Sequence, residues 1–131
     1  MWWDSRKIGV GSPPLLTKDG WLLIYQTVDD KNANHYKIGA MILKADEPHV
    51  ELYRSRYPIM EPDQWYDNHG FKAGVVYPCG AVIRKNQLFV YYGGADSHVC
   101  VATANLDQFL DRLKQGRDTK LESTILAVSS K

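Results

Sequence analysis

The stretch Gly20-Trp21-Leu22-Leu23-Ile24-Tyr25 is the most informative part of the sequence for the fold, because the chain repeats it, displaced by 66 residues, as Asn86-Gln87-Leu88-Phe89-Val90-Tyr91. Both stretches are dense in apolar and aromatic side chains, and each follows a turn signal, at residues 18–20 and 84–86. Before these stretches, residues 13–16 match residues 79–82. After them, residues 35–40 match residues 98–103 when the loop of the second copy is taken as three residues shorter. Each copy therefore predicts a strand, a tight turn, a strand, a polar loop and a strand.

Further strands are predicted at 35–43, 50–54, 74–83 and 98–104, so that the first copy gains a fourth strand near Val50. This layout is typical of a β-propeller blade, a small antiparallel sheet that buries its faces against neighbouring blades. We predict an all-β chain with a partial propeller over residues 1–116, in which blade one spans about 7–56 and blade two about 73–116. Because propellers have about four to eight blades, two blades cannot close a ring.

A single short helix is predicted near the end of the chain. Apolar side chains recur at i, i+3, i+4 and i+7 from Leu106 to Leu113. Asn105 precedes them as an N-cap, and Gly116 ends the helix. The tail, residues 117–131, is polar at both ends, and two outcomes stay open for it: disorder, or one extra strand over 124–128.

Composition excludes several classes of function. The 131 residues contain 16 Lys+Arg and 15 Asp+Glu without a basic cluster, which argues against nucleic-acid binding. The apolar runs are far shorter than the roughly 20 residues of a membrane-spanning helix. Residues 1–7 carry no secretory signal, so the cytoplasm is the default expectation. Cys79 and Cys100 have neither metal-ligand spacing nor a disulfide framework around them and are predicted to be buried thiols.

Several motifs occur in a defined order along the chain. They are Trp3…Lys7-Ile8-Gly9…Gly11-Ser12-Pro13-Pro14, residues 20–25, Val75-Val76-Tyr77-Pro78-Cys79-Gly80 and Tyr91-Tyr92-Gly93-Gly94-Ala95-Asp96. In this order they resemble glycoside hydrolase family 130, which contains β-mannoside phosphorylases and β-mannosidases on a five-bladed propeller. The resemblance runs from about Trp3 to Leu113 and matches only the C-terminal part of a full-length member. It implies part of a mannoside phosphorylase or hydrolase that retains part of the sugar site.

The resemblance also implies roles for single residues. Asp96 matches an aspartate that binds hydroxyls of the mannose, and Tyr92 in the same motif is expected beside the substrate. Lys7 matches a lysine that contacts phosphate. Gln26 stands where the phosphorylases usually carry a phosphate-binding histidine. A neutral amide adds no positive charge, which puts inorganic phosphate as a co-substrate of any parent enzyme in doubt.

No catalytic residue, metal or cofactor is assigned within the chain. The family's acid aspartate, and the arginines that help to hold phosphate, belong to the N-terminal blades, so the chain is expected to be inactive alone. His35 and His98 occupy equivalent places in the two copies, but a zinc site needs three or four convergent ligands, which favours structural histidines. For Asp96, a turn-capping role is the alternative.

A different class of function stays open beside the first: a non-catalytic carbohydrate-binding module or a self-assembling β protein. The partners expected are a mannose-containing saccharide and either further copies of the chain or a chain that supplies the missing blades. The aromatic side chains outside the repeats suit either a carbohydrate platform or the cover of blade surfaces. They are Trp2, Trp3, Tyr57, Trp65 and Tyr66.

Overall fold

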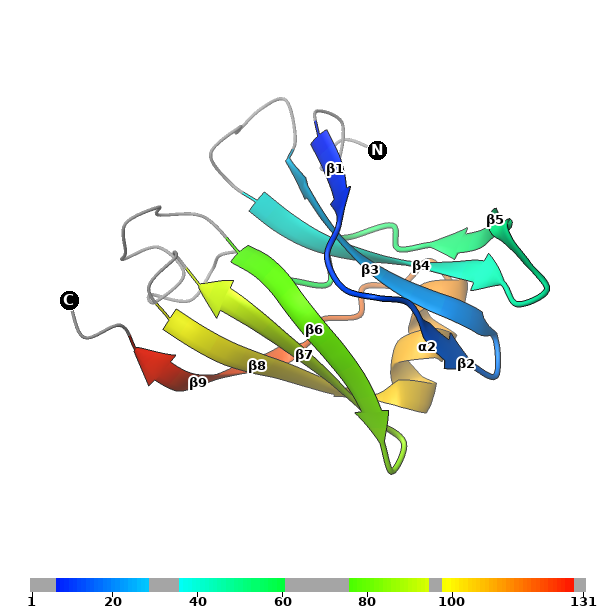
Figure 1. Ribbon diagram of the computed structural model, residues 1–131. Helices are drawn as coiled ribbons and strands as arrows, with labels where there is room; N and C mark the ends of the chain where they lie inside the picture. Colours follow the sequence, from blue (N-terminus) through cyan, green and yellow to red (C-terminus); the bar gives the residue numbers. More distant parts are fainter. Residues whose placement is uncertain (1–6, 29–35, 61–75, 95–97, 129–131) are drawn as a thin grey trace.

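The computed structural model describes residues 7–28, 36–60, 76–94 and 98–128, which form two antiparallel sheets and one helix (Figure 1). The first sheet has the order β1-β3-β4-β5, with β2 also paired to β3. Its strands are β1 (Lys7–Val10), β2 (Leu15–Thr17), β3 (Gly20–Val28), β4 (Tyr36–Lys44) and β5 (Glu47–Arg54). The repeated stretch thus lies in β3, where the sequence predicts a strand.

The second sheet has the order β6-β7-β8-β9. Its strands are β6 (Val76–Arg84), β7 (Gln87–Gly94), β8 (His98–Asn105) and β9 (Glu122–Val128). The repeated stretch is again the second long strand, β7, and the third strand β8 corresponds to β4. β9 pairs with β8 and falls in the tail segment for which disorder and a strand were both open. The prediction of an all-β chain with one short helix is confirmed.

The helix α2 (Leu106–Lys114) begins and ends where the sequence predicts. The Asn105 side chain accepts a hydrogen bond from the Gln108 N–H at 3.0 Å, which caps the first turn. Gly116 adopts a φ of 69°, and its N–H donates to the Leu113 carbonyl at 3.1 Å. Glycine adopts this left-handed conformation without a steric penalty, so Gly116 ends the helix.

The two-residue turn between β6 and β7 uses a left-handed backbone without glycine. Lys85 and Asn86 have φ values of 50° and 60°, and the flanking residues Arg84 and Gln87 pair with each other. Two successive positive φ values are the geometry of a type I′ turn, whose twist matches that of the strands it joins. Asparagine tolerates this geometry well, but lysine does not.

One hydrophobic core joins both sheets and the helix. Leu22 and Ile24 of β3 and Leu88, Val90 and Tyr92 of β7 follow one another at every second position and are buried in it, as period-two alternation requires. The members from the strands are Leu22, Ile24, Ile38, Ala40, Ile42, Leu88, Val90, Tyr92, Cys100 and Ala102. The apolar stripe of α2, predicted from its spacing, adds Leu106, Phe109, Leu110 and Leu113. Burial of these side chains against one another is the main driving force for the fold.

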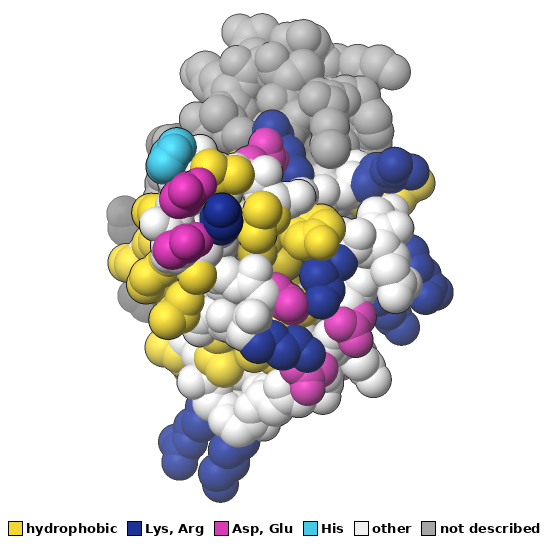
Figure 2. Space-filling view, turned by 90° about the vertical axis from the view of Figure 1, so that its right-hand side faces the viewer, with side chains coloured by type: hydrophobic (Ala, Val, Ile, Leu, Met, Phe, Trp, Pro, Cys, Tyr) yellow, Lys and Arg dark blue, Asp and Glu magenta, His cyan; other side chains and the backbone are white. Residues whose placement is uncertain are grey.

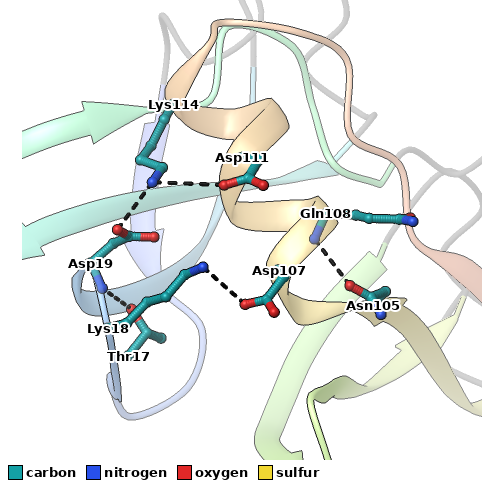
Figure 3. A network of polar contacts seen from close by, with 8 residues as sticks. All are labelled: Thr17, Lys18, Asp19, Asn105, Asp107, Gln108, Asp111 and Lys114. Atoms are coloured by element: carbon teal, nitrogen blue, oxygen red, sulfur yellow. Dashed lines mark hydrogen bonds and ion pairs between the residues drawn. The ribbon is translucent and has the colours of Figure 1, made fainter.

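Ion pairs tie α2 to the turn between β2 and β3 (Figure 3). Lys114 Nζ lies 3.0 Å from Asp19 Oδ1 and 3.7 Å from Asp111 Oδ1, and Lys18 Nζ lies 3.1 Å from Asp107 Oδ1. The hydrogen bond to Asp19 raises the pKa of Lys114 above its ordinary 10.5, and the hydrogen bond to Asp107 does the same for the pKa of Lys18. The helix, which connects β8 and β9 of the second sheet, is thereby held against the first sheet.

The face in Figure 2 intersperses basic and acidic side chains, with hydrophobic side chains exposed among them. Leu52, Tyr53 and Tyr57 are among the exposed hydrophobic residues of the described part. The view shows no broad patch of one charge, which agrees with the net charge of +1.

Candidate functional site

The predicted site residues belong to one end of the two sheets. In Figure 1, β3 and β7 run toward the same side of the molecule, at the upper left, and β1 begins there. Lys7, the first residue of β1, pairs with Val28, the last residue of β3. Strand β7 ends at Gly94. Antiparallel pairing brings the beginning of β1 to the end of β3. Figure 1 shows the end of β7, in the other sheet, on the same side of the molecule.

Gln26 lies at the boundary between the core and this end. It continues the row Leu22–Ile24 on the core face of β3 and pairs with Gly9 on one side and Ile38 on the other. A Cβ atom added to Gly9 would lie 3.6 Å from both Cγ and Nε2 of Gln26, so the amide side chain lies beside the β1 backbone. Gln26 is half-buried, which leaves part of its amide able to bind a ligand.

Tyr92 occupies the corresponding place in the second sheet, but it is only 1% exposed. It continues the buried row Leu88–Val90 and lies opposite Pro78 on β6 and Cys100 on β8. The ring is therefore part of the core and does not present a face to solvent. From this position Tyr92 supports the end of β7, the strand that leads toward Asp96.

Two of the predicted residues lie partly or wholly outside the described part. The backbone of Lys7 is described but its side chain is not, and Asp96 follows the end of β7 by two residues, outside the described ranges. The roles predicted for Lys7, Gln26, Tyr92 and Asp96 stay predictions. What the structure adds is that three of these positions and the strand before the fourth share one end of the fold.

A close contact that was not predicted from the sequence sets the spacing of the two sheets beneath this end. A Cβ atom on Gly11 would lie 2.2 Å from Cγ of Pro78, which is shorter than non-bonded carbon atoms can approach each other. The Gly11 N–H also donates to the Ile24 carbonyl at 3.0 Å. Gly11 therefore lets the segment after β1 approach β6, directly opposite the Tyr92 strand. The glycines within the 7–14 motif were the available signal.

A second feature missed from the sequence supports the other face of β3. The Arg54 Nε donates to the Tyr25 hydroxyl at 3.2 Å, and the guanidinium lies 5.5 Å from the centre of the Tyr25 ring. Tyr25 precedes Gln26 in the chain and is almost fully buried. A hydrogen bond and a cation–π contact on the same ring hold β3 in place on this face, and so fix the position of Gln26.

The residues considered for a metal site, for buried thiols and for a carbohydrate platform lie largely outside the described residues. Within the described part, no three His, Cys, Asp or Glu side chains are close enough together to hold a metal ion. Cys100 is buried in the core, while the side chain of Cys79 is not described. The predicted carbohydrate platform also lies outside the described ranges, except for Tyr57, which is exposed. The other members are Trp2, Trp3, Trp65 and Tyr66, and the side chains of His35 and His98 are likewise not described.

Among the residues that the structure describes, no helix has the length and apolar character needed to cross a membrane.

Known proteins with similar sequences are mannoside phosphorylases. The sequence profile of glycoside hydrolase family 130, described as beta-1,4-mannooligosaccharide phosphorylase, matches residues 1–115. The chain is 41% identical over 100 residues to the 1,2-beta-oligomannan phosphorylase of Thermoanaerobacter sp. (strain X514), covering 76% of this chain and 33% of that protein. It is 34% identical over 115 residues to the beta-1,4-mannooligosaccharide phosphorylase of Ruminococcus albus, covering 86% of this chain and 34% of that protein.

The fold agrees with the sequence comparison. The beta-1,2-mannobiose phosphorylase from Listeria innocua, solved in complex with beta-1,2-mannobiose, matches 86% of this chain and 31% of its own with a TM-score of 0.80 and 34% identity. The chain thus spans about a third of the length of the curated relatives it matches. Its two sheets are two blades of a β-propeller, and the chain belongs to glycoside hydrolase family 130.

Proposed function

We propose that this chain forms part of the saccharide site of a mannoside phosphorylase or hydrolase and binds a mannose-containing saccharide without cleaving it alone. The observation that carries the proposal is the arrangement of Lys7, Gln26 and Tyr92 at one end of the two blades, with β7 leading to Asp96. Support comes from the Listeria innocua relative, whose structure holds beta-1,2-mannobiose and matches most of this chain.

Each residue would have a distinct role at this end. A carboxylate at Asp96 would accept hydrogen bonds from two neighbouring hydroxyls of a mannose ring, a geometry in which an ionised acceptor is stronger than a neutral one. Gln26, half-buried beside Gly9, would donate its amide N–H to an oxygen of the substrate or of phosphate. Lys7 would supply positive charge toward phosphate. Tyr92 would act from the core as a positioning residue.

The described part offers no proton donor at this end. Its carboxylates lie in the β2–β3 and β4–β5 turns, along β5, in α2, in the segment that follows α2 and at the beginning of β9. Cleavage of a glycosidic bond requires an acid that protonates the leaving oxygen. We therefore propose that turnover needs a proton donor supplied by another part of the parent protein or by a second chain.

Titration with β-1,2-mannobiose tests this site. We expect binding by the chain, with Asp96→Ala weakening it at least tenfold, because two charge-assisted hydrogen bonds are lost. Asp46→Ala is the matched control: it removes an exposed carboxylate from the turn at the opposite end of β4 and should leave the affinity unchanged. Equal affinities of the two variants, or no binding by the parent chain, would refute the site.

Product analysis tests the inactivity and the use of phosphate. We expect the purified chain to release neither mannose nor, with inorganic phosphate present, mannose 1-phosphate. When a chain carrying the remaining blades is added, release of mannose 1-phosphate would identify inorganic phosphate as the co-substrate, and release of free mannose alone would identify water. Turnover by the isolated chain would contradict the proposal.

The outer face of the second sheet favours a partner sheet. Val82, Tyr91 and Val99 alternate outward from the core residues of β6, β7 and β8 and are 48%, 39% and 52% exposed. Exposed apolar side chains that share one sheet face mark an interaction surface. We propose that another blade, from the parent protein or from a second copy, covers this face. Light scattering tests self-association: a dimer that Val82→Lys dissociates supports the second copy, and a monomer excludes it.

A further inference from the structure

A groove opens at the opposite end of the second sheet from the candidate site. It lies between α2 and the ends of three strands, at Gln87, the first residue of β7, at Thr103, near the end of β8, and at Glu122, the first residue of β9. Its volume is about 270 Å³. The groove is smaller than the roughly 300–1,000 Å³ of pockets that enclose drug-sized ligands. It therefore fits a ligand unit of about the size of one sugar ring.

The groove is lined by amide and hydroxyl groups. Gln87, Asn105 and Gln108 contribute amides, and Thr103 and Thr119 contribute hydroxyls. Amides and hydroxyls both donate and accept hydrogen bonds, which matches the mixed donor and acceptor character of sugar hydroxyls. The buried ring of Phe109 lies beneath them and keeps the base of the groove packed.

The walls of the groove are held before any ligand arrives. Asn105 caps α2, and the Leu106 N–H donates to the Asn86 carbonyl at 2.9 Å. On the other side, the Leu121 N–H donates to the Ile59 carbonyl at 3.1 Å, and Lys120 Nζ donates to the Pro58 carbonyl. A preformed groove spares the ligand the entropy cost of ordering its walls.

The charges at the rim favour a neutral ligand. Arg112 and Lys120 line the groove together with one carboxylate, Glu122. Lys120 Nζ already lies 3.6 Å from Asp118 Oδ1, which offsets its charge. The positive charge of Arg112 and the negative charge of Glu122 then sum to zero. A site for phosphate or a carboxylate would need an excess of positive charge, which this rim does not provide.

We propose that the groove between α2 and the beginnings of β7 and β9 is a second saccharide-binding site for a neutral oligosaccharide. It would hold one sugar unit by hydrogen bonds to Gln87 and Gln108, while the rest of the saccharide chain extends through its open side. The inference does not rest on the proposed function, because none of its residues belongs to the end that carries Gln26 and Tyr92. Because no exposed aromatic ring lines the groove among the residues that the structure describes, the affinity should be weak.

The test is a titration of the ¹⁵N-labelled chain with β-1,2-mannobiose, followed by the chemical shifts of its backbone amides. We expect a separate group of shifts at residues 103–105, 108–112 and 119–122. The double variant Gln87→Ala/Gln108→Ala should raise the Kd for this group at least tenfold. Gln115→Ala is the matched control, an exposed glutamine at the end of α2 outside the groove, and should leave that Kd unchanged.

Two further arms separate the alternatives. Asp96→Ala should abolish shifts at the candidate site and leave those of the groove, so the two sites can fail independently. Inorganic phosphate, used as an anion probe, should leave the groove amides unmoved. The proposal is overturned if mannobiose shifts none of these amides, if the double variant binds as the parent does, or if phosphate reproduces the shifts. Unchanged shifts elsewhere in the double variant show that it is folded.

Discussion

Gly11→Ala should destabilise the chain strongly, because the two sheets meet at this position. The added Cβ would lie 2.2 Å from Cγ and 2.9 Å from Cβ of Pro78, and 3.1 Å from the Ile24 carbonyl oxygen. Carbon atoms prefer separations of about 3.5–4.0 Å, so the contact must open by more than about 1 Å. Pro78 is buried and its ring cannot rotate away, while the hydrogen bond to Ile24 holds the Gly11 backbone.

The expected cost is at the upper end of that for overpacked cores, about 3 kcal/mol. For a chain of this length, each kcal/mol lowers Tm by roughly 3–4 °C, so the midpoint should fall by roughly 10 °C. Gly80→Ala is the matched control. A Cβ there meets no atom within 4 Å, and alanine in a strand gains about 0.5–1 kcal/mol over glycine, so its Tm should rise slightly.

Urea denaturation and thermal unfolding, each followed by far-ultraviolet circular dichroism, measure both variants against the parent chain. The contrast in sign between the two glycines is the decisive result, because the lower backbone entropy of alanine in the unfolded chain by itself predicts stabilisation at both positions. If Gly11→Ala unfolds at the same midpoint as Gly80→Ala, the close approach of the segment after β1 to β6 is not present and the reasoning is refuted.

Three further perturbations test other parts of the fold. Lys114→Met removes the ion pair to Asp19 and should lower Tm, more at low than at high salt. The pKa of Lys114 is raised above 10.5 in the folded chain, so this stabilisation is fully present below pH 10.5 and is lost as the pH rises through the folded pKa. The difference in Tm between the variant and the parent should therefore persist at pH 8 and disappear in strong alkali. Replacing Lys85-Asn86 by Asn-Gly should stabilise the β6–β7 hairpin by about 1 kcal/mol in urea denaturation, and an unchanged midpoint would contradict the left-handed turn. Asn105→Ala should cost about 1 kcal/mol by loss of the helix cap, and Asn105→Ser should recover most of it; equal stability of the two would show that the cap contributes nothing.

The alternation of β7 already contained the information that Tyr92 is buried. Leu88, Val90 and Tyr92 follow one another at every second position, and the first two are unambiguous core residues. The family motif predicts a place for Tyr92 beside the substrate, and that role stays a prediction; its register places the ring in the core. The residue before it, Tyr91, faces outward and is 39% exposed.

Near neighbours in the chain are enough to form the repeated strands, the turn at Lys85 and the helix with its Asn105 cap, and the order of the motifs is enough to indicate family 130. Which of these elements meet depends on the packing of the whole fold. The pair between Asp19 and Lys114 spans 95 residues, and the approach of Gly11 to Pro78 crosses between sheets. Caps and turns are set by local backbone geometry, which the sequence encodes directly, whereas the spacing of two packed sheets depends on how all the core side chains fit together at once.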